Sequence, residues 1–228
     1  MLRAALAAVL AVVPALPLAQ AAPPSGAPPA PVLAPVAAPS PAPAPVAVVS
    51  TAHRHLGFFL RMDLGLGYLD SSASQGGIDY SISGFAVGVG IAVGGAVAEN
   101  VILAGDLWGI AAVSPSMNVN GITGTASDSS MGLSGLGLNL TYYFMPANVY
   151  VSVTPSMVIA TLTVSGVSGD TQVGFGGKVG VGKEWWVGDH WGLGLAGQFF
   201  FGINQDQGPN PPTWTTLGGA LAFSATYN

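Results

Sequence analysis

The sequence predicts an all-β protein in which residues 55–228 form an eight-stranded antiparallel up-and-down transmembrane β-barrel. Half of the 228 residues are hydrophobic and only 7% are charged, whereas soluble domains carry roughly 25% charged residues. Residues of alternating polarity recur in eight segments, as in strands with one apolar face. The connections between these segments alternate between short and long, which is typical of barrels in the bacterial outer membrane.

Residues 1–21, MLRAALAAVLAVVPALPLAQA, have the pattern of a secretory signal peptide. They contain one basic residue, Arg3, then an apolar run, and they end in Ala19-Gln20-Ala21. A basic start, an apolar core and small residues at the cleavage site are the three parts of such a signal. Prolines within the run argue against an anchoring helix, so we expect export and cleavage after Ala21.

Residues 22–54 form a linker that consists mostly of Ala, Pro and Val up to about Val48. Proline removes backbone donors and favours the extended polyproline II conformation, so this stretch is expected to be a semi-rigid periplasmic spacer. A solvated spacer is the simpler interpretation, although peptidoglycan or a periplasmic partner could bind it.

The eight alternating segments follow from His55 onward. In the first, Phe58, Leu60 and Met62 fall on one face, and small or charged residues fall on the other. A secreted β-sandwich adhesin would also alternate, but its outward face would carry charges. Here one face is continuously apolar and the other is small or polar, which predicts a barrel that is apolar outside. The segments span residues 56–69, 80–93, 100–113, 130–145, 149–163, 172–187, 191–203 and 213–228.

The connections after segments two, four and six are short, and those after one, three, five and seven are longer and polar, as in SSASQGGID and SPSMNVNGITGTASDS. Short periplasmic turns and long outer loops would put both termini on the periplasmic side. Aromatic residues gather near the short turns and predict a girdle at the membrane interface. These residues are Phe58, Tyr142, Phe144, Trp185, Trp186, Trp191 and Tyr227.

Five charged residues have inward positions, and they predict a charge network in the lumen. They are Arg61, Asp63, Asp106, Lys178 and Glu184. The interior of an eight-stranded barrel is only wide enough for side chains to fill. Opposite walls can therefore touch, and we expect Arg61–Asp63 and Asp106–Lys178 to neutralise one another there, because buried charges must pair. A gated ion path is the alternative, favoured by inward glycines that would leave space.

In strand count, loop asymmetry and the ending GGALAFSATYN, residues 55–228 resemble the small eight-stranded outer-membrane barrels: the OmpA transmembrane domain, OmpX and OmpW-like proteins. The resemblance implies contact with outer-membrane lipid in a bacterial cell. It also implies recognition of the C-terminal strand by the barrel assembly machinery, through a terminal aromatic residue. Here Tyr227 is followed by Asn228.

Catalytic chemistry finds little support in the sequence. The absence of cysteine excludes thiol nucleophiles and thiolate metal sites. Barrels that deacylate or palmitoylate lipid A need a histidine base near a serine. His53 and His55 precede the strands, where we expect them to be solvated rather than metal-bound, and His190 falls in a short turn. We therefore expect neither an enzyme nor a cofactor. The net charge of −5 gives no reason to expect nucleic acid.

These observations predict a structural or surface-interaction role in the outer membrane. A narrow pore for small solutes or ions is the first alternative, and a secreted β-sandwich adhesin is the second.

Overall fold

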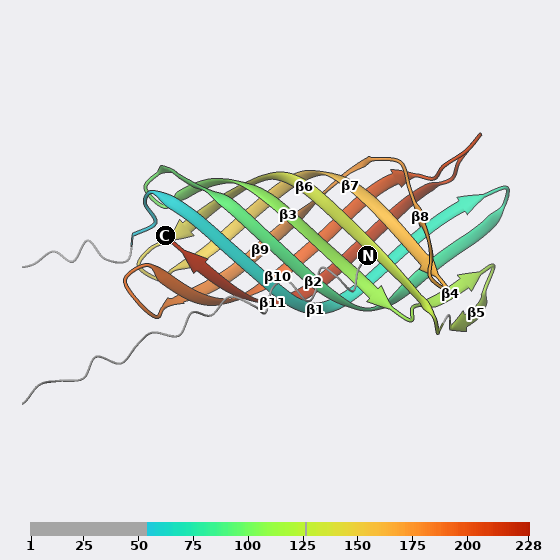
Figure 1. The fold of residues 1–228 in the computed structure, drawn as a ribbon, viewed down its shortest axis with the longest axis horizontal. Coiled ribbons are helices and arrows are strands. Elements are labelled where there is room, and N and C mark those ends of the chain that lie inside the picture. Colours follow the sequence, from blue (N-terminus) through green and yellow to red (C-terminus); the bar gives the residue numbers. More distant parts are fainter. Residues whose placement is uncertain (1–53, 126) are drawn as a thin grey trace, which may run out of the picture. The chain divides into compact units, whose positions relative to one another are not determined.

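The computed structural model describes residues 54–125 and 127–228, and strands dominate this part of the chain (Figure 1). The signal peptide of residues 1–21 and the linker, apart from Arg54, lie outside the described residues and stay predictions. None of the described residues forms a helix long and apolar enough to cross a membrane.

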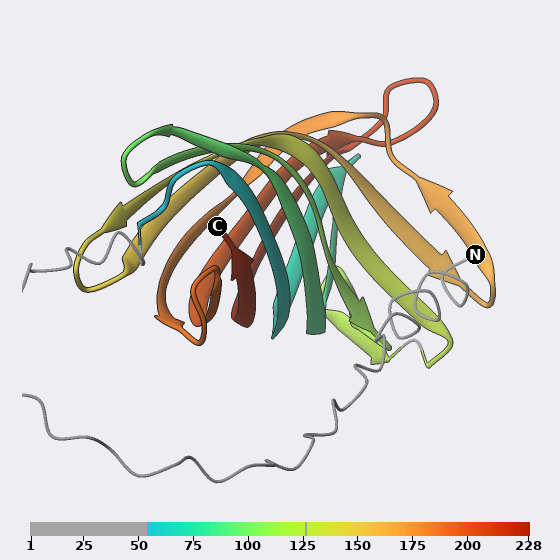
Figure 2. The same ribbon diagram turned by 60° about the vertical axis from the view of Figure 1, so that its left-hand side comes forward.

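Eight long strands close into one antiparallel barrel. Around the sheet their order is β1, β11, β10, β9, β7, β6, β3 and β2, and β2 pairs again with β1. Each long strand overlaps one of the eight predicted segments, so the predicted fold class is confirmed (Figure 2). A sandwich of two sheets is excluded by this closure. The long strands are β1 (Phe58–Gln75), β2 (Ile78–Ala98), β3 (Val101–Val113), β6 (Ser129–Phe144), β7 (Val149–Val164), β9 (Gly174–Trp186), β10 (Trp191–Gln205) and β11 (Thr213–Tyr227).

Burial alternates along each strand with the period of two that the sequence predicts. In β1, Phe59 and Leu69 are buried while Leu64 and Leu66 are 60% and 70% exposed. Along the middle of every long strand the outward side chains are mainly apolar, which is the inverse of a soluble β-protein. The predicted register of the two faces is therefore confirmed.

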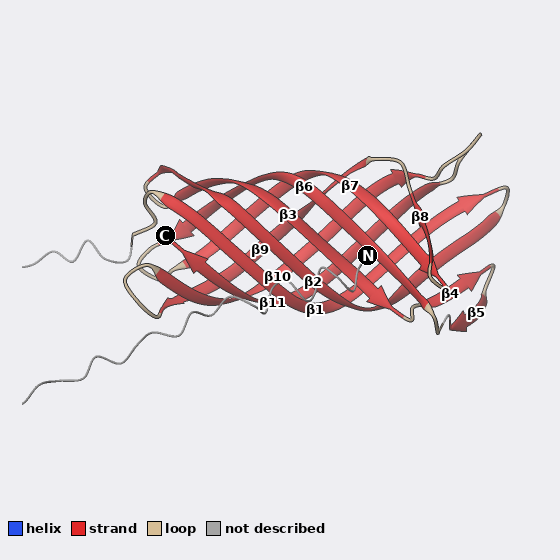
Figure 3. Cartoon of the chain, in the orientation of Figure 1, coloured by secondary structure: helices blue, strands red, loops and turns tan. Residues whose placement is uncertain are grey.

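Three of the polar connections predicted as loops form hairpin extensions instead (Figure 3). β1 and β2 run through SSASQGGID and turn at Gly76–Gly77, while β4 (Ser116–Val119) and β5 (Ile122–Thr125) turn at Asn120–Gly121. β8 (Val167–Asp170) pairs with β7 after a turn at Ser165–Gly166. All three turns have two residues with positive φ, the conformation of tight hairpins that match strand twist. We call this end of the barrel the hairpin end and the opposite one the short-turn end.

The outer wall carries an apolar band of the height that a membrane requires. Along β1 the outward residues from Phe58 to Tyr68 are apolar or aromatic, and the next outward residue is the exposed Asp70. This stretch of eleven residues matches the 9–11 residues, roughly, of a tilted transmembrane strand. Asp70 thus marks the limit of the apolar band towards the hairpin end.

Leu195 lies midway in this band, because it pairs with Phe223, which pairs with Leu64 of β1. Leu195→Arg should lower the free energy of unfolding by about 2–4 kcal/mol, since a cation there meets the bilayer midplane. Denaturant unfolding in lipid vesicles measures this loss. Thr215→Arg is the matched control: Thr215 is exposed and pairs with Ser72, beyond Asp70, so its cost should stay below about 1 kcal/mol. Equal losses would contradict the position of the band.

Candidate functional site

The five charged residues predicted for the lumen all point inward and are almost fully buried. Their exposed fractions are 3% for Arg61, 8% for Asp63, 1% for Asp106, 5% for Lys178 and 2% for Glu184. Their direct ion pairs form two clusters, one with each basic residue. An isolated buried charge destabilises the folded state, so the contacts of each charged group determine how well it is stabilised.

The Arg61 cluster lies near the short-turn end. Arg61 Nε is 3.7 Å from Glu184 Oε1, and its Nη2 donates to the Tyr143 hydroxyl over 2.8 Å. Tyr143 in turn donates to Glu184 at 3.2 Å, and Thr226 donates to the same carboxylate at 2.7 Å. The guanidinium also lies over the Tyr150 ring, 4.1 Å from its centroid, which adds cation–π attraction. Arginine and carboxylate are thus joined both directly and through a phenol.

The Lys178 cluster holds two carboxylates. Lys178 Nζ is 3.0 Å from Asp106 Oδ2 and 3.7 Å from Asp63 Oδ2. Asp106 Oδ2 also accepts a hydrogen bond of 3.0 Å from Thr154, which itself accepts one of 2.8 Å from Asn139. The second oxygen of Asp63 is buried with no hydrogen-bond partner among the described residues. With both carboxylates ionised, this cluster carries one negative charge, and Asp63 is its weakly held member.

The predicted pairing of Arg61 with Asp63 is therefore wrong, although both residues belong to the lumen. Side chains two residues apart on a strand lie side by side on the same face of the sheet. Arg61 and Asp63 therefore both extend into the lumen, and each contacts a residue of another strand. Arg61 meets Glu184 of β9, and Asp63 meets Lys178 of the same strand. The predicted Asp106–Lys178 contact is present.

Large side chains fill the space that the inward glycines leave. A Cβ atom on Gly135 would lie 2.5 Å from the Trp108 ring, and one on Gly182 would lie 2.6 Å from the Tyr150 ring. The expectation that glycines leave an open lumen is thus wrong at these positions. Trp108 also contacts Phe200, with 5.3 Å between ring centroids, in an apolar layer towards the hairpin end. A second buried layer includes Phe59, Tyr143 and Tyr150.

His55 closes the short-turn end, which no sequence pattern indicated. It is fully buried, not solvated as expected, and its ring stacks on Tyr143 with centroids 3.4 Å apart. Its Nε2 lies 2.8 Å from Asn148 Oδ1, and Asn228 Nδ2 lies 2.7 Å from its Nδ1. A neutral ring protonated on Nε2 satisfies both contacts. His55 thereby joins the start of the barrel to Asn228 after its last strand.

Six of the seven predicted girdle residues face outward near the short turns. Phe58 and Trp191 both contact Tyr227, with ring centroids 6.2 Å and 5.3 Å apart. Trp186 is the exception, because it follows the outward Trp185 and so falls on the inner face, 5.2 Å from the His55 ring. The other outward members are Tyr142 and Phe144. Their position at a membrane interface stays a prediction.

The described histidines have partners other than a serine. His55 contacts two asparagines, and His190 Nδ1 lies 2.9 Å from the carbonyl oxygen of Asn228. In residues 54–125 and 127–228, no group of three or more His, Asp or Glu side chains could hold a metal ion.

Comparison with known proteins identifies the fold. No family model matches the chain, and no curated protein matches it. Neisserial surface protein A has 18% identity over 75% of this chain and 96% of its own, with a TM-score of 0.50. OprG from Pseudomonas aeruginosa has 15% identity over 76% and 98%, with a TM-score of 0.45, and AlkL has 18% over 76% and 90%, with 0.40. At this identity the first likeness shows the fold alone, that of a small outer-membrane barrel.

The two clusters should respond differently to loss of one carboxylate charge. Glu184→Gln leaves Arg61 without its counter-ion and should cost about 3–5 kcal/mol of unfolding free energy. Asp63→Asn neutralises the surplus negative charge beside Lys178, so its cost should be below about 1 kcal/mol. Both changes keep side-chain shape, and denaturant unfolding in one lipid system compares them.

Arg61→Met combined with Glu184→Gln should be milder than Glu184→Gln alone, because no unpaired charge remains. If Asp63→Asn were as destabilising as Glu184→Gln, the assignment of separate clusters would be wrong.

Protonation of His55 should make the protein less stable as the pH falls. Burial lowers the pKa of His55 from its ordinary 6.5, and the charge of Arg61 lowers it further. The hydrogen bonds to Asn148 and Asn228 and the attraction of Glu184 raise this pKa but do not offset burial. A lowered pKa in the folded state means that stability is complete above pH 6.5 and is lost as the pH falls towards the folded value. The thermal midpoint should therefore drop between pH 7.5 and 5, and it should drop less in His55→Phe. An identical drop in both proteins would assign the effect to other groups.

Proposed function

We propose that this chain is a bacterial outer-membrane barrel whose lumen is closed and which has a structural or surface-interaction role. Filling of the lumen is the observation that carries the proposal. Along the barrel axis, an aromatic layer around Tyr143 and Tyr150, the two charge clusters and an apolar layer around Trp108 and Phe200 all occupy the interior.

A closed lumen leaves the two ends and the outer wall as the surfaces that can interact. The apolar band supports residence in a bilayer. The likeness of the barrel's fold to that of Neisserial surface protein A is consistent with the outer membrane. At the hairpin end, β4–β5 and the long tips of β1 and β2 extend beyond Asp70. Paired hairpins that extend beyond the apolar band favour contact with partners rather than passage of solutes.

An absence of catalysis is part of the proposal. Acyl transfer would need a histidine beside a serine, and the described histidines pair instead with asparagine groups at the short-turn end. Insertion by the barrel assembly machinery is also part of the proposal, since the resemblance to small outer-membrane barrels implies recognition of the last strand with Tyr227. The narrow-pore alternative would need a connected path past Lys178 and Arg61, where the buried clusters lie.

Reconstitution into planar bilayers tests the closed lumen. We expect no steady single-channel conductance, whereas a porin of 16 strands in the same membrane conducts through its aqueous channel. Steady current steps whose ion selectivity changes in Lys178→Met would contradict the proposal and establish the narrow pore.

Display at the cell surface is tested by labelling, because the chain has no native cysteine. On intact cells a membrane-impermeant maleimide should label Thr123→Cys in the exposed β5 but not Gly188→Cys in a short turn. A cysteine at Gly188 has open space, so folding is not at risk. Labelling only at residue 188 would reverse the orientation.

A further inference from the structure

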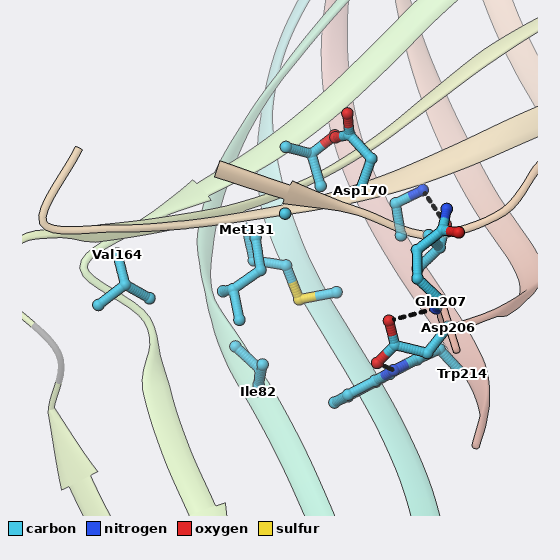
Figure 4. Close-up of a pocket in the computed structure, with 12 residues that line it drawn as sticks. Ile82, Met131, Val164, Asp170, Asp206, Gln207 and Trp214 are labelled. Carbon is cyan, nitrogen blue, oxygen red and sulfur yellow. Dashed lines mark hydrogen bonds between the residues drawn. The ribbon is translucent and has the colours of Figure 1, made fainter. Parts of the chain in front are cut away.

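A cavity of about 430 Å³ opens at the hairpin end, between the barrel mouth and the segments that cover it (Figure 4). Its floor is apolar and consists of the buried side chains of Ile82, Met131 and Ala160. Leu162 and Val164 of β7 continue this surface. The volume and lining are those of a small-molecule site in the mouth of a β-barrel.

Polar groups reach the cavity from one loop and one short strand. Asp206, in the β10–β11 connection, accepts hydrogen bonds from the Gln207 amide at 2.7 Å and from Trp214 Nε1 at 3.4 Å. Asp170 of β8 also lines the cavity and accepts from Thr161 at 2.7 Å. None of the ion pairs found in residues 54–125 and 127–228 involves either carboxylate. Two acids without basic partners therefore border an apolar floor.

The surroundings of the cavity carry negative charge only. Of the five basic residues in the chain, Arg61 and Lys178 are buried in the lumen. Arg54 pairs with Glu99, and Lys183 donates to the Ala147 carbonyl, both at the short-turn end. Arg3 lies outside the described residues. The described part of the hairpin end has five acids and no base; the acids are Asp70, Asp79, Asp128, Asp170 and Asp206.

We propose that this cavity binds organic ammonium ions, that is, small molecules with an apolar body and one cationic head. The apolar floor takes the body, while Asp206 attracts the head beside the indole of Trp214. Aromatic rings and carboxylates both attract cations, and the apolar lining distinguishes an organic cation from a hydrated metal ion. This ligand class goes beyond the proposed structural and surface role.

A matched series of ligands tests the proposal by calorimetry on the full chain in zwitterionic lipid nanodiscs, with empty nanodiscs as the blank. 3-Phenylpropylammonium, 3-phenylpropanol and 3-phenylpropanoate share one apolar body and differ in charge. We expect the ammonium to bind about tenfold or more tightly than the alcohol, and the carboxylate to bind most weakly.

Variants distinguish binding in the cavity from general attraction by the negative charge of the hairpin end. Asp206→Asn removes the charge and keeps an acceptor oxygen for the Gln207 amide but not for Trp214 Nε1, and it should weaken ammonium binding about fivefold or more. Asp79→Asn removes the same charge at the same end but lines a different pocket with Ser74 and Asn118, so its effect should stay below about twofold. Ala160→Leu fills the floor without changing charge, and it should abolish binding.

Three results would each overturn the proposal. The first is equal affinity for the ammonium and the alcohol. The second is an equal effect of Asp206→Asn and Asp79→Asn, which would reduce the site to diffuse attraction. The third is full binding by Ala160→Leu with a native thermal midpoint, which would show that the cavity is not used.

Discussion

The narrow interior of an eight-stranded barrel is the constraint on which the other features of this structure depend. Its width allows side chains from opposite walls to meet, so a large residue on one strand requires a small one where it arrives. The same holds between neighbouring strands, where Trp108 covers Gly135 and Tyr150 covers Gly182, each its directly paired residue. Glycine on the inner face is therefore complementary to the aromatic residues, and the two together exclude a continuous open lumen.

The same constraint determines how charge is accommodated. Within so narrow a space a charged side chain cannot reach bulk water, and it must find partners across the lumen. Arg61 finds a carboxylate, a phenol and an aromatic face, whereas Lys178 must be shared between two carboxylates. The imbalance leaves one cluster neutral and the other negative. Tyr143 connects the neutral cluster to the His55 ring that closes the short-turn end.

Sequence reasoning found what depends on local periodicity and missed what depends on contacts across the lumen. Alternation gave the eight strands and the inward direction of Arg61 and Asp63, because side-chain direction follows from position within a strand. It could not give their partners, since pairing with β9 depends on the closed geometry. The small, polar residues of the hairpin tips predict loops, because they lack the apolar alternation of the membrane-spanning strands. His55 belongs to no sequence pattern, and Trp186 cannot face outward together with Trp185 because adjacent residues of a strand point to opposite faces.

The chain has few basic residues, and those that lie in the lumen are not available to balance the acids at the hairpin end. Two of the four described bases are used inside the barrel and the other two lie at the short-turn end. The carboxylates at the hairpin end consequently have no basic neighbours, and their field is not compensated locally. Where such a field meets an apolar cavity, as beside Asp206 and Trp214, attraction of a cation and burial of its apolar body act together. Neither the acidic end nor the cavity alone would distinguish an organic cation from a metal ion or a neutral solute, because each supplies only one of the two interactions.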